Sequence, residues 1–155
     1  MDRVPSTIVV LPYLRVQEAI YKATRGFVGR RLAGAPTLLL TTTGRKTGRT
    51  RTHALIYYRD GSAWVVVASN GGSDRGPGWL ANVRAQPHVG VQDGRRKCDG
   101  VARVVTGVER ARLWPLVNRN NRGLARLLHR GVQGRYDVYQ KRTEREIAVV
   151  VLEAT

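Results

Sequence analysis

Short apolar runs separated by turn residues recur along most of the chain. Their lengths and their content of β-branched residues predict strands. The run AWVVVAS at residues 63–69 is almost wholly apolar, so we expect that strand to be buried on both faces. The dipeptides Asp60-Gly61 and Asp93-Gly94 each predict a tight hairpin. Strands are expected at residues 37–42, 52–59, 63–69, 89–92, 97–105 and 147–152.

Other segments carry apolar residues at steps of three and four, the spacing of a helix that packs one face on a core. The longest covers residues 10–33 and has a basic polar face. Shorter helices are expected at residues 79–85, 108–119, 123–129 and 136–142. Tight hairpins join antiparallel strands, so the element order predicts a mainly β, α+β fold, a barrel with helices packed outside. We expect a basic amphipathic helix over residues 1–35 and the barrel domain over residues 36–155.

The charge of the chain narrows the classes of partner. Its 155 residues include 27 Lys and Arg against 11 Asp and Glu, a formal net charge of +16. Such a balance predicts an anionic partner: a nucleic acid, an acidic membrane surface or a small polyanionic ligand. With no span-length apolar run and no signal peptide, we expect a cytoplasmic protein, or one peripheral to the inner face of the cell membrane. The basic helix over residues 10–33 fits two interpretations, packing on the sheet or resting on anionic lipid.

The densest cationic feature is the turn Gly44-Arg45-Lys46-Thr47-Gly48-Arg49-Thr50-Arg51 between the first two predicted strands. Arg45, Lys46 and Arg51 are placed to converge on one anion, with help from the Thr47 hydroxyl and backbone N–H groups. The spacing is not that of a Walker loop, because Arg45 separates the glycine from the lysine. A solvated turn or a nucleic-acid patch remains an alternative to a phosphate site.

Three weaker features follow along the chain. Ala68-Ser69-Asn70-Gly71-Gly72 ends the most buried strand with small residues, which let a flat ring approach the backbone. Trp79 and Asn82 share one face of a short helix, where they either meet a ligand or serve as core and surface residues. Tyr136 and Tyr139 either line a pocket mouth or pin a helix to the barrel.

Metal and nucleophile chemistry has little support in the sequence. The histidines His53, His88 and His129 have no second ligand at metal spacing, so we expect no metal site. The single cysteine, Cys98, lies in a predicted strand and fits packing better than catalysis. No G-x-S-x-G elbow is present.

Four motifs in one order resemble the deazaflavin-dependent nitroreductase family, small split β-barrel flavin and deazaflavin oxidoreductases that include quinone reductases. The motifs are G-R-K-[ST]-G-x-x-R, V-V-A-S-x-G-G, W-x-x-N and Y-x-x-Y-x-x-R-T, and the resemblance covers residues 36–153. It implies an FMN-binding-protein-like split barrel that uses coenzyme F420, an 8-hydroxy-5-deazaflavin, as hydride donor. The implied acceptor is a quinone, an enone or activated alkene, or a nitroaromatic compound.

The resemblance also implies roles for residues. Arg45, Lys46, Thr47 and Arg51 would hold the phosphate of the coenzyme; Ala68, Ser69, Asn70 and Gly71 would line its tricyclic ring. Trp79 and Asn82 would lie near the ring and side chain. Tyr136 and Tyr139 would face the acceptor, and either of them or Ser69 would donate a hydrogen bond or proton as the acceptor gains negative charge.

Some features leave alternatives open. Many relatives carry Lys where this chain has Asn70, which removes one cationic contact to the coenzyme. Residues 120–135 are longer than expected there and form either a lid or an extra basic surface helix. FMN is the alternative cofactor, and a non-catalytic nucleic-acid-binding or lipid-binding module is the alternative function, although the family predicts no nucleic-acid partner. A homodimer is expected, on the premise that the barrel leaves exposed strand edges.

Overall fold

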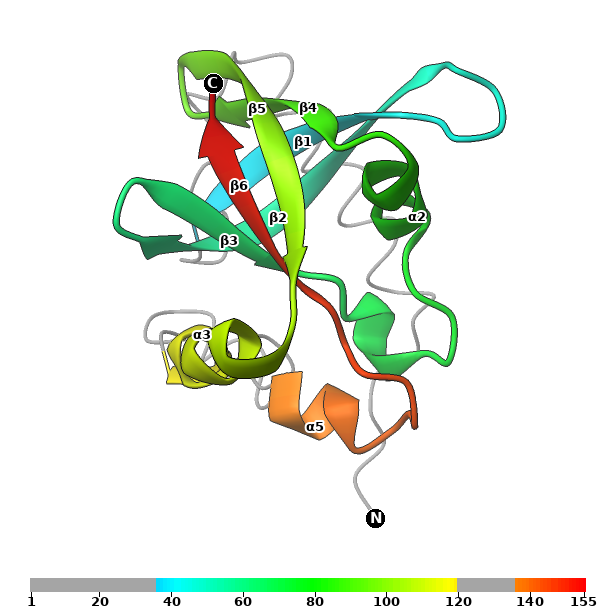
Figure 1. The fold of residues 1–155 in the computed structure, drawn as a ribbon, viewed down its shortest axis with the longest axis vertical. Coiled ribbons are helices and arrows are strands. Elements are labelled where there is room, and N and C mark those ends of the chain that lie inside the picture. Colours follow the sequence, from blue (N-terminus) through cyan, green and yellow to red (C-terminus); the bar gives the residue numbers. More distant parts are fainter. Residues whose placement is uncertain (1–35, 120–135) are drawn as a thin grey trace.

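The computed structural model describes residues 36–119 and 136–155 (Figure 1). The predicted helices at residues 10–33 and 123–129 and the extra segment 120–135 lie outside the described residues, so the division at residue 35 stays a prediction. Within the described part, the strands are β1 (Thr37–Thr43), β2 (Thr50–Asp60), β3 (Ala63–Val67), β4 (His88–Asp93), β5 (Arg96–Val105) and β6 (Val149–Ala154). The helices there are η2, a 3₁₀ turn (Asn70–Gly72), α2 (Gly78–Ala85), α3 (Gly107–Arg119) and α5 (Tyr136–Gln140).

All neighbouring strands pair antiparallel in a closed barrel of order β1-β2-β3-β6-β5-β4. The barrel closes where Leu39–Thr41 of β1 pair with β4. The predicted barrel with outer helices is therefore confirmed. The premise of exposed strand edges is wrong for the described strands, because each has a neighbour on both sides. No helix in these parts of the chain is long and apolar enough to cross a membrane.

Both predicted Asp-Gly hairpins are present. Asp60 pairs with Ala63 and Asp93 with Arg96, so each aspartate ends a strand and each glycine opens a two-residue turn. Gly61 and Gly94 have φ angles of 60° and 63°. Glycine reaches this left-handed region without steric cost, which is why these dipeptides set the hairpin register.

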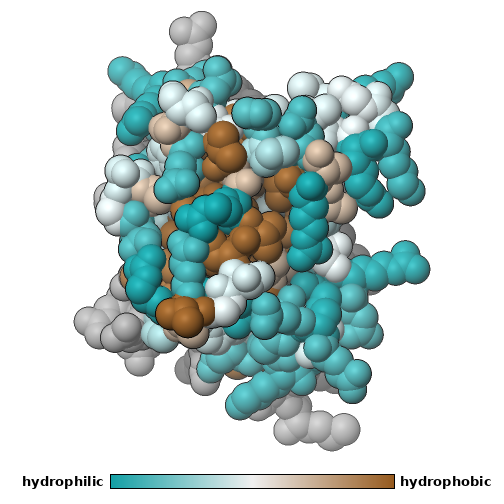
Figure 2. All heavy atoms as spheres, viewed as in Figure 1, coloured by the Kyte–Doolittle hydropathy of each residue, from teal (hydrophilic) through white to brown (hydrophobic). Residues whose placement is uncertain are grey.

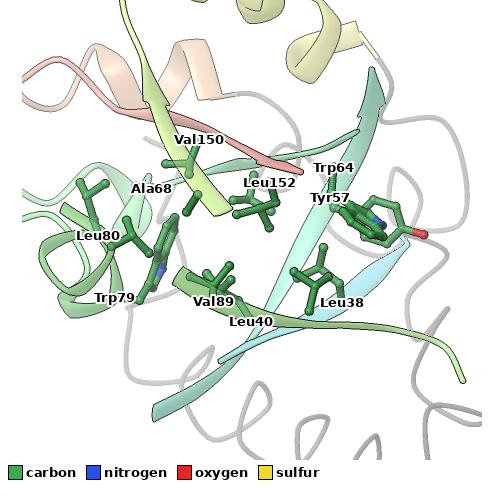
Figure 3. Packing of buried hydrophobic residues seen from close by; sticks show 14 of the residues in the cluster. Leu38, Leu40, Tyr57, Trp64, Ala68, Trp79, Leu80, Val89, Val150 and Leu152 are labelled. Carbon is green, nitrogen blue, oxygen red and sulfur yellow. The ribbon is translucent and has the colours of Figure 1, made fainter. Parts of the chain in front are cut away.

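The barrel wall separates two hydrophobic cores, and β3 contributes to both. Trp64 and Val66 point into the barrel, while Val65 and Val67 pack outside against α3 and α5. This alternation confirms the prediction that the strand is buried on both faces. The inner core is closed at one end by α2 through Trp79, Leu80 and Val83 (Figure 3). The outer core includes Tyr58, Val105, Leu113, Val117, Tyr136, Ile147, Val149 and Val151.

A buried carboxylate lies at the end of the barrel where Tyr57 and Trp64 pack, away from Trp79 (Figure 3). Asp93 accepts hydrogen bonds from the Tyr57 hydroxyl at 2.9 Å and from Trp64 Nε1 at 3.0 Å. It also pairs with the Arg59 guanidinium at 2.8 Å, which stacks 4.7 Å from the Trp64 ring. One buried carboxylate thus serves as a shared acceptor for two buried side-chain donors and one guanidinium.

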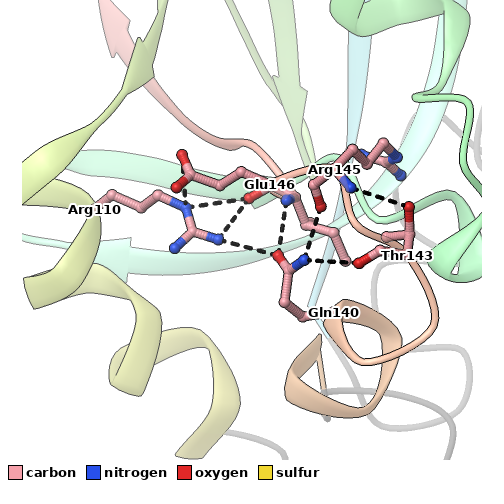
Figure 4. Close-up of polar contacts among 6 residues, drawn as sticks. Arg110, Gln140, Thr143, Arg145 and Glu146 are labelled. Carbon is pink, nitrogen blue, oxygen red and sulfur yellow. Dashed lines mark hydrogen bonds and ion pairs between the residues drawn. The ribbon is translucent and has the colours of Figure 1, made fainter.

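The last strand begins two residues later than the apolar run predicts. The Ile147 N–H donates to Gln140 Oε1 at 2.8 Å, and its carbonyl accepts from Arg110 at 2.9 Å (Figure 4). Because both backbone groups of Ile147 are bound by side chains, ladder pairing of β6 starts only at Val149. The segment leading into β6 is therefore held by a polar network, whose members also reach the loop after β3.

Replacing Asp93 tests the energetic weight of this carboxylate. Asp93→Ala leaves the Tyr57 and Trp64 donors without that acceptor, and each unsatisfied buried group costs about 1–3 kcal/mol. We expect the free energy of unfolding, measured by urea denaturation, to fall by about 3 kcal/mol. Glu109→Ala removes the exposed partner of Arg103 and is the control, with a midpoint close to that of the parent protein. Equal losses in the two variants would contradict a structural role for Asp93.

Candidate functional site

The cationic turn, residues 44–51, is an ordered connection between β1 and β2. Gly44 N–H donates to the Arg49 carbonyl and Gly48 N–H to the Gly44 carbonyl, both at 2.8 Å. Arg49 N–H donates to Thr47 Oγ1 at 3.3 Å, and Gly48 has a φ of 69°. These bonds leave the Lys46 and Thr47 amides without an acceptor among the described residues. The backbone of the turn is therefore fixed, and the N–H groups of Lys46 and Thr47 are available to donate to a ligand.

Asn82 of α2 fastens this turn to the barrel. Its Oδ1 accepts the Arg45 N–H at 3.1 Å, and its Nδ2 donates to Thr42 Oγ1 at 3.1 Å. The Asn82 side chain is buried; its bond to Thr42 is buried as well, and its bond to Arg45 is partly buried. Trp79 and Asn82 share one face of α2, as expected from their spacing. The Asn82 amide, however, points toward the cationic turn. Asn82 thereby sets where the cations of the turn lie.

The cations of the turn are exposed and not neutralised. Arg45, Lys46, Arg49 and Arg51 are all exposed, and no carboxylate of the described residues pairs with them. Other arginines of the same protein do have carboxylate partners: Arg59, Arg103, Arg110 and Arg112. Arg49 was not among the predicted contacts, although it belongs to the same turn. The structure thus separates cations with internal partners from those available to an anion.

The predicted ring segment follows β3 directly. Ala68 is fully buried in the inner core, Ser69 is half-buried, and Asn70 and Gly71 are exposed. Asn70 has a φ of 44°, a left-handed conformation unusual for a residue with a side chain, and its Nδ2 donates to the Arg75 carbonyl at 2.9 Å. The segment therefore passes from the barrel core to the surface within four residues.

Trp79 and Asn82 connect this segment with the cationic turn. Trp79 packs in the inner core beside Ala68, at the end of the core shown on the left of Figure 3. Asn82 follows one helical turn later and bonds to Arg45. The two predicted coenzyme-binding regions therefore meet the same face of α2.

The loop over residues 68–73 rests on the segment that precedes β6. A Cβ on Gly72 would lie 2.7 Å from the Tyr139 carbonyl oxygen, so only glycine fits there. Thr143 Oγ1 donates to Asp74 Oδ1 at 2.8 Å. Arg145 donates to the carbonyls of Ala68 at 3.3 Å, Ser69 at 2.8 Å and Ser73 at 2.7 Å.

Sequence reasoning included Gly72 in the glycine-rich segment after the third strand but assigned it no role, and it missed Arg145. The V-V-A-S-x-G-G motif contains Gly72, so its role had a signal, but nothing distinguishes Arg145 among 27 Lys and Arg residues. Asp74, Thr143 and Arg145 also border an open polar depression of about 530 Å³. Figure 2 shows hydrophilic side chains gathered on this side of the molecule, where η2 and α5 lie in Figure 1.

The two predicted acceptor-facing tyrosines have different surroundings. Tyr136 is buried in the outer core, 6.1 Å from the Tyr58 ring and 6.5 Å from Trp114, and its hydroxyl accepts from Tyr58 at 3.2 Å. Tyr139 is half-buried, next to Gly72. Burial raises the pKa of Tyr139, and raises the pKa of Tyr136 still further, so both phenols stay protonated near neutral pH. Tyr136 pins α5 to the barrel, while Tyr139 is the more accessible donor.

The described residues offer little support for a metal site or a cysteine nucleophile. Among residues 36–119 and 136–155, no group of three His, Cys, Asp or Glu side chains is placed to hold a metal ion. Cys98 is half-buried and packs beside the inner core. The site is therefore cationic and hydrogen-bonding in character, next to an apolar core.

Solved structures define the class of fold. The chain matches a structure described as an F420-H2 dependent reductase, with a TM-score of 0.59 and 36% identity over 76% of this chain and 94% of that one. It also matches a structure described as a domain-swapped dimer, with a TM-score of 0.62 and 33% identity over 92% and 99% of the chains. HutZ of Vibrio cholerae, at 14% identity and a TM-score of 0.53, shares the fold alone. The protein is a split β-barrel.

Sequence comparisons then identify the family. The family model for the F420H(2)-dependent quinone reductase matches residues 13–154. A curated F420H(2)-dependent quinone reductase of Mycobacterium tuberculosis is 45% identical over 142 residues, which cover 90% of this chain and 88% of that protein. The chain belongs to this family. It is an oxidoreductase that uses coenzyme F420, so the deazaflavin expectation is confirmed over the FMN alternative.

The residues present fit such a coenzyme. A phosphate and carboxylates need cationic and N–H donors, and the cationic turn offers four exposed cations without carboxylate partners in the described parts of the chain. A flat ring needs small residues and an apolar wall, and Ala68, Gly71 and the Trp79 core lie at the other end of the α2 face.

Glycine substitutions test how tightly the 68–73 loop rests on α5. In Gly72→Ala the new methyl would meet the Tyr139 carbonyl at 2.7 Å, and φ is 79°. In Gly71→Ala φ is 64°, but the methyl would enter open space. Both variants bear the left-handed strain of roughly 1 kcal/mol, and only Gly72→Ala adds a backbone collision. We expect the melting temperature of Gly72→Ala to fall clearly below that of Gly71→Ala. Equal melting temperatures would contradict the close approach.

Proposed function

We propose that this protein transfers a hydride from reduced coenzyme F420 to a quinone, with the cationic turn binding the anionic part of the coenzyme. The observation that carries the proposal is the set of four exposed cations, Arg45, Lys46, Arg49 and Arg51, on a turn with a fixed backbone and without carboxylate partners in the described regions. Holding like charges together is unfavourable without a counter-anion. A phosphate with a carboxylate tail supplies that counter-charge.

The turn offers several kinds of contact to a phosphate. Arg45 and Arg51 present planar donor forks suited to oxyanions, and Lys46 adds a compact charge. The Thr47 hydroxyl accepts from Arg49 N–H and keeps its own proton to donate. The amides of Lys46 and Thr47 complete the donor set. In this proposal Asn82 does not contact the coenzyme, because its amide is bonded to Arg45 and Thr42. It is a positioning residue that holds the cationic turn in place.

The remaining residues orient the ring and the acceptor. Bound and reduced, the deazaflavin supplies a hydride from C5. Ala68 and Gly71 let its ring approach the backbone, and the Trp79 core behind Ala68 excludes water. Ser69 and Tyr139 donate hydrogen bonds to the acceptor oxygen as it gains negative charge, because the raised pKa keeps the Tyr139 phenol protonated.

Tyr136 contributes indirectly in this proposal. Its ring lies 6.3 Å from that of Tyr139, inside the outer core. Tyr136 therefore fixes the position of α5 and of Tyr139. Of the two tyrosines that the sequence led us to expect at the acceptor, we propose that only Tyr139 contacts it.

A quinone is the acceptor we favour over an enone or a nitroaromatic compound. The relative from Mycobacterium tuberculosis is a quinone reductase by name and aligns with 90% of this chain. Reduction of a quinone also needs hydrogen-bond donors at its oxygen, which Ser69 and Tyr139 supply.

We extend the proposal to location and assembly. The basic helix face that the sequence predicts for residues 10–33 favours contact with the anionic inner surface of the cell membrane, where lipid-soluble quinones reside. A homodimer is supported by the structural relative described as a domain-swapped dimer. We propose that the positive charge of the protein serves to bind the coenzyme and anionic lipid, and we expect no nucleic-acid partner.

Removing two cations of the turn tests coenzyme binding. The double variant Lys46→Ala/Arg51→Ala loses two charge-assisted contacts, each worth about 1.5–3 kcal/mol, so we expect its Kd for coenzyme F420 to rise about 100-fold or more. Binding is measured by fluorescence titration.

The control is Arg103→Ala/Arg112→Ala, which removes the same net charge from residues paired with Glu109 and Asp60. Its Kd should stay within a few-fold of the parent value. Similar losses in the two double variants would mean that overall charge, and not the turn, binds the coenzyme.

A pair of phenylalanine substitutions separates the tyrosines. Tyr139→Phe removes the donor to the acceptor, so we expect kcat with menadione to fall about tenfold or more with an unchanged Kd for the coenzyme. Tyr136→Phe removes only the acceptor of the Tyr58 hydrogen bond and should lower the melting temperature more than kcat. A Tyr139→Phe variant with full activity would remove this residue from the mechanism.

A further inference from the structure

Arg145 is half-buried, and its guanidinium, unlike that of Arg110, the other half-buried arginine of the described residues, binds only backbone carbonyls. Its Nε, Nη1 and Nη2 each donate to a backbone carbonyl, those of Ser73, Ala68 and Ser69. No carboxylate forms an ion pair with it among the described residues. All three hydrogen bonds of the guanidinium are thus donated to the backbone of one loop.

That loop is the segment to which the ring of the coenzyme is assigned. Because a peptide unit is planar, fixing the carbonyls of Ala68 and Ser69 also fixes the direction of the Ser69 and Asn70 N–H groups. The loop needs such support at Asn70, which has a φ angle of 44°. A left-handed conformation at a residue with a side chain persists only where the surroundings hold it.

Arg145 itself is held in place by the segment before β6. Its carbonyl accepts from Gln140 Nε2 at 2.7 Å, and its N–H donates to Thr143 Oγ1 at 3.3 Å (Figure 4). Thr143 in turn donates to Asp74, just beyond the loop. The guanidinium therefore projects from a fixed backbone and joins the carbonyls of Ala68, Ser69 and Ser73 to the segment before β6.

We infer that Arg145 is a positioning residue, which holds the 68–73 loop in the conformation that receives the coenzyme ring. This inference rests on the proposed function. It assigns to Arg145 a role that depends on the three-donor geometry of the guanidinium and not on its charge. The cations of the turn, in contrast, act on the anionic part of the coenzyme directly.

The test compares Arg145→Lys, Arg145→Gln and the control Arg59→Lys. Lysine keeps the charge but cannot reach three carbonyls at once, so both Arg145 variants should raise the Kd for coenzyme F420 about tenfold or more. Arg59 also donates to a backbone carbonyl, that of Ser62, but it lies beside Asp93 and bonds to no residue of the loop, so its variant should keep the parent Kd. The salt dependence of binding should stay at the parent slope in Arg145→Lys and Arg145→Gln, and should flatten in Lys46→Ala/Arg51→Ala.

Amide hydrogen exchange supplies a readout that needs no coenzyme. In Arg145→Lys, protection should fall at residues 69–74 and persist in β3 and β6. Unchanged exchange, a Kd restored to the parent value by lysine, or global unfolding of both Arg145 variants would each overturn the inference. If the parent protein itself failed to bind coenzyme F420, the proposed function would fall, whereas a parent that binds with unaffected Arg145 variants would remove only the role of Arg145.

Discussion

The hydrogen bonds of Asn82 join the parts of the site that sequence alone leaves separate. One uncharged amide accepts from the Arg45 backbone and donates to Thr42, and it does so from a helix whose preceding turn places Trp79 beside Ala68. A carboxylate in this position would also accept from the turn, but it would neutralise part of the positive charge gathered there. A neutral side chain therefore fixes the turn while leaving its cations available to an anion.

The distribution of positive charge follows the same division. Arg59, Arg103, Arg110 and Arg112 have carboxylate partners within the fold, and Arg110 is also bonded to the Ile147 carbonyl. The cations of residues 44–51 have no such partners in the described parts of the chain. A net charge of +16 is thus a poor guide to binding by itself. What distinguishes the cationic turn is that four exposed cations without a carboxylate partner among the described residues lie together on one short segment.

Local patterns predicted the barrel well because its elements are local. The apolar run of β3 and the Asp-Gly turns depend on residues close in sequence, and both were confirmed. The start of β6 at Val149 was not predictable, because the competing partners of Ile147 are Gln140 and Arg110. The hydrogen-bond partners of Asn82 and Arg145 could not be predicted for a related reason. Their partners lie 37 to 77 residues away along the chain, and spacing within a motif carries no information on them.

The two halves of the proposed coenzyme site are built with opposite polarity. At the cationic turn, a neutral amide binds a backbone N–H and leaves charged side chains exposed. At the loop after β3, a charged guanidinium binds backbone carbonyls, and small residues are left at the surface. A ligand with a polyanionic end and a flat, nearly neutral ring meets each half with the matching chemistry. Because both halves touch α2 or the residues packed on it, a displacement of that helix would alter the binding of both ends of the coenzyme together.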